Sequence, residues 1–263
     1  MKAEYLKLGK CIWCLNEKPL VSFYDKPHTI SKQIGGSYIG FDICDSCNSY
    51  FGTTDKTTKY PMSVELAFKE IFNATRHLLP DFSGTQKRNY PILKSIYFEY
   101  YKSKRIFRIK KRFEFRKDFI KDFTRQFKKG IYEVFLQEYH RNTELGLDRR
   151  FDKIRDFVRY DKGDLPLYFA DNNGIYLLSE DSDKPILAFN ESNYSIIDDY
   201  GFYSIWLFGH VLYIEVTPRA VLSRDIYLKA EAKKIVGSGF INNSIKEMRY
   251  ITELDFTLQK LRT

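Results

Sequence analysis

The stretch Cys11-Ile12-Trp13-Cys14, separated by 29 residues from Cys44-Asp45-Ser46-Cys47, decides how the N-terminal part of this chain folds. All four cysteines of the protein lie in these two CxxC pairs. Four thiolates bind Zn²⁺ tetrahedrally at about 2.3 Å and leave no open coordination position. Paired spacing of this kind is typical of a metal site in a reducing compartment rather than of a disulfide framework. We therefore predict a structural zinc ion held by Cys11, Cys14, Cys44 and Cys47.

The residues around the cysteines predict a small ββα unit. Residues 23–24 and 39–43 are candidate strands on either side of the Gly35-Gly36 turn. Asp45 or Ser46 is a suitable N-cap for a short helix that ends near Gly52. A core this small is not stable without an additional cross-link, which a bound metal ion would provide.

The remainder of the chain predicts an α+β fold in three segments: a zinc-bound head over residues 1–60, a basic helical arm over 61–160 and a C-terminal domain over 161–263. In the arm, the periodicity predicts a helix over residues 63–79 and then one long helix, or two joined near Gly130, over 97–140. A core-facing aromatic stripe recurs every four residues, formed by Phe115, Phe119, Phe123 and Phe127.

After Pro166 the hydrophobic period changes to two, which predicts an antiparallel meander. The expected strands are residues 167–170, 175–179, 186–189, 194–197, 202–208 and 211–216. The sequence Ser244-Ile245-Lys246-Glu247 has the form of a capping box and predicts a final helix. The C-terminal domain is expected to serve recognition or assembly.

The net charge of +9 is concentrated in the middle of the chain. Residues 61–160 carry 24 Lys and Arg against 13 Asp and Glu, whereas residues 161–263 carry 11 against 15. A localised positive field attracts polyanions, and phosphate neutralisation explains such an excess directly. We predict nucleic-acid binding through the most basic stretch, with the contacts assigned to Lys104, Arg105, Arg108, Lys110, Lys111 and Arg112.

Three motifs together resemble those of the zinc-containing HNH endonucleases. They are the first CxxC pair, the stretch Pro27-His28-Thr29-Ile30-Ser31-Lys32-Gln33-Ile34-Gly35-Gly36, and Cys44-x-x-Cys47-Asn48-x-x-Phe51-Gly52-x-x-Asp55. The resemblance covers about residues 8–60. It implies a ββα-metal nuclease head that hydrolyses DNA phosphodiester bonds, with restriction or phage defence as a plausible role.

The resemblance implies a role for each matching residue. His28 would be the general base that takes a proton from water, and Asn48 would be the catalytic, metal-ligating residue of the helix. A carboxylate should complete the site for Mg²⁺ or Mn²⁺, because these cations prefer oxygen ligands. Asp55 has the spacing of the family, with Asp25 and Asp42 as the other candidates.

The chain departs from the family pattern beside the histidine, where Pro27 replaces the usual acidic residue. The alternative function is therefore a catalytically inactive nucleic-acid-binding zinc protein. The remaining histidines (His77, His140 and His210) stand alone and are expected at the surface.

The composition also bounds where the protein acts. No run is apolar enough to span a bilayer, so we expect a soluble, cytoplasmic protein without a membrane partner. DNA is the expected partner. RNA, and a protein partner or a second copy bound at the C-terminal domain, stay open.

Overall fold

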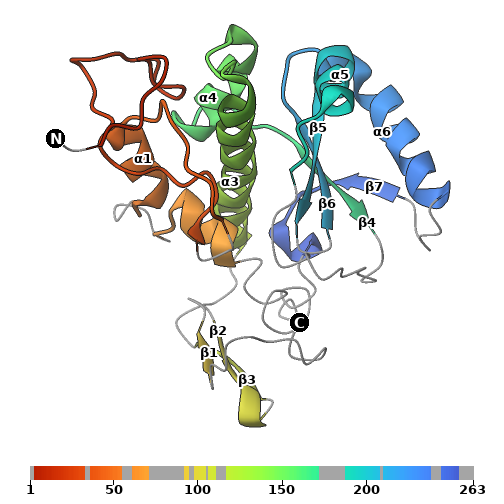
Figure 1. The fold of residues 1–263 in the computed structure, drawn as a ribbon. Coiled ribbons are helices and arrows are strands. Elements are labelled where there is room, and N and C mark those ends of the chain that lie inside the picture. The colour runs from red at the N-terminus through yellow and green to blue at the C-terminus, as the bar shows by residue number, and fades with distance from the viewer. Residues whose placement is uncertain are drawn as a thin grey trace.

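The computed structural model describes residues 3–32, 36–54, 61–70, 92–94, 98–104, 106–110, 117–171, 187–207, 210–237 and 244–254. Within these ranges the fold is α+β, as predicted, with two antiparallel sheets (Figure 1). Of the helices described, none has the length and apolar character needed to cross a membrane.

The head contains less strand than its sequence predicts. The expected helix is present as α1 (Asp45–Gly52). The two expected strands are reduced to one isolated bridge between His28 and Ile39, and a second bridge joins Lys10 to Glu17. The head is therefore mostly loop around buried Trp13, Phe23 and Phe51.

The long helix α3 (Lys117–Thr143) stands between the head and the larger sheet (Figure 1). Phe119, Phe123 and Phe127 are buried, which confirms the described part of the aromatic stripe; Phe115 lies outside the described residues. Residues 64–70 are helical, as predicted, and Phe68 stacks on Phe127 with ring centroids 6.1 Å apart. Gly130 permits this approach, since a Cβ there would lie 2.9 Å from Phe68.

The prediction of helix from residue 97 is wrong for residues 98–109. These residues form β2 (Phe98–Tyr101), the turn η2 (Lys102–Lys104) and β3 (Ile106–Ile109), and β1 (Ile92–Lys94) completes a three-stranded sheet in the order β1-β2-β3. The segment is rich in aromatic and β-branched residues, which favour strands. The many cations obscured this preference.

The four-stranded sheet has the order β5-β6-β4-β7, and all its pairings are antiparallel. Strands β4 (Leu167–Asp171), β5 (Phe202–Leu207) and β6 (His210–Glu215) confirm three predicted strands. Helix α6 (Ala220–Gly237), which the sequence analysis does not predict, covers the face opposite α3. On that face Tyr227 stacks on Phe202, with ring centroids 4.6 Å apart.

Three other C-terminal predictions are wrong, and the strand expected at 175–179 lies outside the described residues. The strand expected at 186–189 is not present in its described part, since residues 187–189 are loop. The segment 194–197 belongs to helix α5 (Glu191–Tyr200), which Asn190 caps and Gly201 ends at a φ of 75°. Ser244–Glu247 is not a capping box but strand β7, which pairs with β4 and is followed by the turn η4 (Ile251–Glu253). Sheet pairing therefore overrides the local helix signal.

One buried hydrophobic cluster joins all three segments of the chain. It runs from Trp13 in the head through Phe135 of α3 to Ile205 of the sheet. The short elements η3 (Arg149–Phe151) and α4 (Asp152–Val158) pack against α3 and contribute Phe157 and Val158. The head thus shares its core with the rest of the described protein.

Candidate metal centre and its surroundings

The four cysteines come together in the geometry of a tetrahedral metal site. Their sulfur atoms all lie within 4.8 Å of one another, and the Sγ atoms of Cys14 and Cys44 are 3.7 Å apart. Ligands at about 2.3 Å from a tetrahedral ion are about 3.8 Å from each other. Three of the thiols are buried and Cys14 is partly exposed. The cluster fits a structural metal such as zinc, and its four sulfurs leave no position for substrate.

Two N–H donors bind sulfurs of this cluster. The backbone N–H of Cys44 donates to Cys11 Sγ (3.4 Å), and Arg159 Nε donates to Cys47 Sγ (3.2 Å). Four thiolates around a dication carry a net charge of −2, which a guanidinium partly neutralises. Burial acts against the charged form, but the hydrogen bond to Cys47 raises the pKa of Arg159. Arg159, which the sequence analysis missed, therefore ties the cluster to the end of α4.

A second arginine joins the first CxxC loop to α4. Arg155 Nε donates to the carbonyl of Ile12 (2.7 Å), and its Nη1 donates to Asp152 (2.6 Å). Its side chain is only 3% exposed, and burial lowers its pKa. The loop that presents Cys11 and Cys14 is thus fixed from a helix more than 140 residues away.

Asp42 and His140 form a buried pair between the head and α3. His140 Nδ1 accepts from the backbone of Gly146 (3.1 Å), so Nε2 carries the proton that faces Asp42 Oδ2 (3.1 Å). Asp42 also accepts from the backbone N–H groups of Lys7 and Leu8 (both 3.0 Å). The expected surface position of His140 is wrong, as it is for buried His210. Asp42 is committed to these bonds and does not serve as the carboxylate of a catalytic cation.

Replacing Asp42 with alanine is expected to lower the free energy of unfolding at pH 7 by about 3–5 kcal/mol, because His140 and two backbone donors lose their partner. Burial opposes ionisation, yet the bonds from His140 and the backbone lower the pKa of Asp42 in the folded protein. Its ionised form therefore stabilises the fold above its unfolded pKa of about 3.9. This contribution is lost as pH falls through the folded pKa.

Urea unfolding at pH 7 and in acid tests this expectation. Asp25→Ala is the matched control, since Asp25 is exposed. Equal stability of the Asp42→Ala and Asp25→Ala proteins at pH 7 would contradict the role of the pair.

His28 lies half-buried on the same head. Its Nδ1 is shielded from solvent and has no hydrogen-bond partner in the described part of the chain. Burial, and then the positive charges of Lys32 and Lys26, lower the pKa of His28 below its usual 6.5. The next residue, Thr29, is buried and bonds Glu138 of α3, which anchors this part of the loop. His28 is therefore held as a neutral imidazole in a cationic setting at neutral pH.

The other predicted catalytic residues are only partly defined. Asn48 is partly buried in α1, one turn after Cys44. Asp55 lies outside the described residues. Within the described ranges, the four cysteines form the sole group of three or more His, Cys, Asp or Glu ligands close enough to share a metal ion.

Three of the six predicted nucleic-acid contacts are described, and they lie in or directly after the elements η2 and β3. Lys104 is exposed in η2, Arg108 is exposed in β3, and Lys110 follows β3. Arg105, Lys111 and Arg112 lie outside the described residues. The predicted basic surface therefore belongs to the three-stranded sheet.

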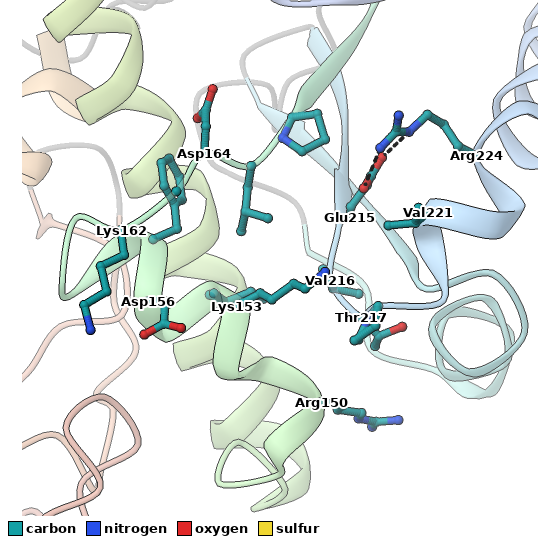
Figure 2. A pocket seen from close by; sticks show the side chains of 16 residues that line it. Arg150, Lys153, Asp156, Lys162, Asp164, Glu215, Val216, Thr217, Val221 and Arg224 are labelled. Atoms are coloured by element: carbon teal, nitrogen blue, oxygen red, sulfur yellow. Dashed lines mark hydrogen bonds and ion pairs between the residues drawn. The ribbon is translucent and has the colours of Figure 1, made fainter.

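A separate cavity of about 410 Å³ lies between α4 and the start of α6 (Figure 2). Two of its acidic side chains form ion pairs. Arg224 binds both oxygens of Glu215 (2.6 and 3.1 Å), and Asp164 pairs with Lys128 (3.3 Å). None of the catalytic, metal-binding or nucleic-acid-binding residues predicted from the sequence lines this cavity.

Comparison of the chain with protein-family models, with curated proteins and with solved structures gives no match. The resemblance to HNH endonucleases therefore depends on the motif residues of the head alone. What the structure adds to those residues is the Cys₄ cluster and its links to α3 and α4.

Proposed function

We propose that this protein is a metal-dependent endonuclease that hydrolyses DNA phosphodiester bonds with its zinc-stapled head. The observation that carries the proposal is the state of His28. Burial and two neighbouring lysines lower its pKa, so that the ring is neutral at pH 7. A neutral imidazole is the form that accepts a proton from water in general base catalysis.

The same surroundings suit a phosphate. Lys26 and Lys32 are exposed on the loop that carries His28. Arg141 of α3 lies over the exposed ring of Tyr38, 4.1 Å from its centroid. A scissile phosphate beside His28 would meet these cations, which supports binding of a polyanion at this face of the head.

A catalytic Mg²⁺ or Mn²⁺ would stabilise negative charge on the scissile phosphate. Asn48 supplies one neutral oxygen, which is a weak anchor for such a cation. We assign Asp55 the place of the missing carboxylate, because its spacing after Asn48 and Gly52 matches the family pattern.

A second candidate function is non-catalytic binding of nucleic acid by the same zinc-stapled head. It is favoured by Pro27, which is buried where the family has an acidic residue. Both functions share the cationic surface and differ only in cleavage.

Incubation of plasmid DNA with the purified protein is expected to give nicked or linear product with Mg²⁺ or Mn²⁺, and none with EDTA. Asp55→Ala is expected to abolish cleavage while zinc content and DNA affinity are retained. Wild-type protein that binds DNA but leaves it intact with either cation would support the binding function instead. In that case cleavage by Pro27→Asp would show that the carboxylate was the missing part.

A further inference from the structure

The β2–β3 pair forms an antiparallel ribbon at the edge of the smaller sheet. Phe98 pairs with Ile109 and Tyr101 pairs with Ile106, with η2 at the tip. β3 is the edge strand, because the order is β1-β2-β3. In Figure 1 this sheet lies below α3, apart from the four-stranded sheet. Among the described strands, none pairs with the outer edge of β3.

The sequence that contains η2 and β3 is strongly basic. Residues 102–112 contain seven Lys and Arg and no acidic residue. Ser103 and Lys104 at the tip and Arg108 on β3 are exposed. Across the strands, Arg108 pairs with Glu99, whose carboxylate also accepts from the Tyr101 hydroxyl (2.9 Å). One carboxylate engaged in this way does not offset the surrounding cations.

An apolar side chain stands among these cations. Ile106 is 51% exposed and lies two residues before Arg108, so both are on the same face of β3. Positions i and i+2 of a strand are about 6.6–6.8 Å apart. That is the length of two base-pair steps in B-form DNA, at about 3.4 Å each. The spacing of the exposed face therefore matches the spacing of stacked bases.

We propose that the β2–β3 ribbon enters the major groove of B-form duplex DNA and reads base edges there. This inference rests on the proposed function only in taking nucleic acid as the ligand. The major groove is about 12 Å wide and admits a two-stranded ribbon, whereas the minor groove is about 6 Å wide. The major groove of duplex RNA is too deep and narrow for side chains to read.

Each exposed side chain then has a distinct role. Arg108 donates two hydrogen bonds to O6 and N7 of a guanine, the commonest specific contact in the major groove. Ile106 contacts the methyl group of a thymine about two steps away. Lys104 at the tip binds a phosphate and adds affinity without sequence preference.

Fluorescence anisotropy of the full-length, zinc-loaded protein without added Mg²⁺ or Mn²⁺, which prevents metal-dependent cleavage, tests the proposal. Probes are a mixed-sequence DNA duplex, the RNA duplex of the same sequence, the single DNA strand, and the DNA duplex with 7-deazaguanine at every guanine. The expected order places duplex DNA about tenfold or more tighter than duplex RNA. Removal of N7 is expected to weaken wild-type binding.

Three variants distinguish recognition of the base edges from electrostatic attraction to the phosphates. Arg108→Gln loses the paired contact with guanine, so affinity for duplex DNA falls roughly 5- to 100-fold and 7-deazaguanine has no further effect. Lys104→Gln lowers the log–log salt slope by about 1. Lys233→Gln, an exposed lysine on α6, is the matched control and leaves binding unchanged.

Equal affinity for duplex RNA or for the single strand would overturn the proposal. So would an Arg108→Gln protein that still distinguishes 7-deazaguanine. These failures are independent of the nuclease proposal, because binding is measured without a catalytic cation. Protein that reads duplex DNA yet never cleaves it contradicts the nuclease alone, and protein that cleaves without this preference contradicts the ribbon alone.

Discussion

Protein carrying Cys47→Ser is expected to lose its zinc and the native fold of the whole described chain, not of the head alone. Structural zinc sites supply about 10–16 kcal/mol of folding free energy in zinc-finger peptides at pH 7. That is comparable with the total stability of a domain, about 5–15 kcal/mol. Because one hydrophobic cluster runs from the head through α3 to the sheet, loss of the head uncovers apolar surface on α3.

Zinc analysis and near-ultraviolet circular dichroism measure the two losses. Ser46→Ala is the matched control, since Ser46 is exposed in α1 between two of the cysteines. A Cys47→Ser protein that keeps the wild-type melting temperature and near-ultraviolet spectrum would contradict the shared core. Wild-type protein purified without chelators and found free of zinc would contradict the zinc site itself.

The second large effect is expected at His28. His28→Ala should lower the rate of DNA cleavage about 10²- to 10⁴-fold, the usual contribution of a general base. Zinc content and DNA affinity should stay unchanged, because His28 is not one of the four cysteine ligands of the zinc ion. Because burial and the charges of Lys32 and Lys26 lower its pKa, the rate should stay high at pH 7 and fall only below pH 6.5.

The pH dependence of the cleavage rate distinguishes a catalytic role of His28 from a structural one. Lys32→Gln removes one of the charges that lower the pKa of His28, so the acid limb of the rate profile should move to higher pH. A purely structural histidine would leave that limb where it is. Cleavage by His28→Ala at the wild-type rate would exclude the residue as the base.

The sequence predicts those parts of the structure that depend on local spacing. The two CxxC pairs indicate the metal cluster, and the period-two pattern indicates β4, β5 and β6. Helix α5 is not predicted: its N-cap Asn190 and C-cap Gly201 are helix signals, but the short apolar run between them resembles a strand. Such runs do not distinguish helix from strand by periodicity alone.

What the sequence does not predict depends on contacts between distant segments. Ser244–Glu247 forms a strand because β4 offers an unpaired edge. Arg159 and His140 acquire their roles only where α3 and α4 meet the head. Neither residue carries a motif, so its neighbours in the sequence give no indication of its partner.

The link between Arg159 and Cys47 also has a consequence for the order in which the protein is made. The two residues are 112 positions apart, so the ribosome completes the cysteine cluster long before it reaches the arginine. At about 5–20 residues per second, this interval is roughly 6–22 s. For most of that time Trp13 and Phe51 lack the α3 surface, and until its end they lack the α4 surface, which together complete their packing in the finished protein. Zinc captured early by the nascent chain would hold the head compact until those helices emerge.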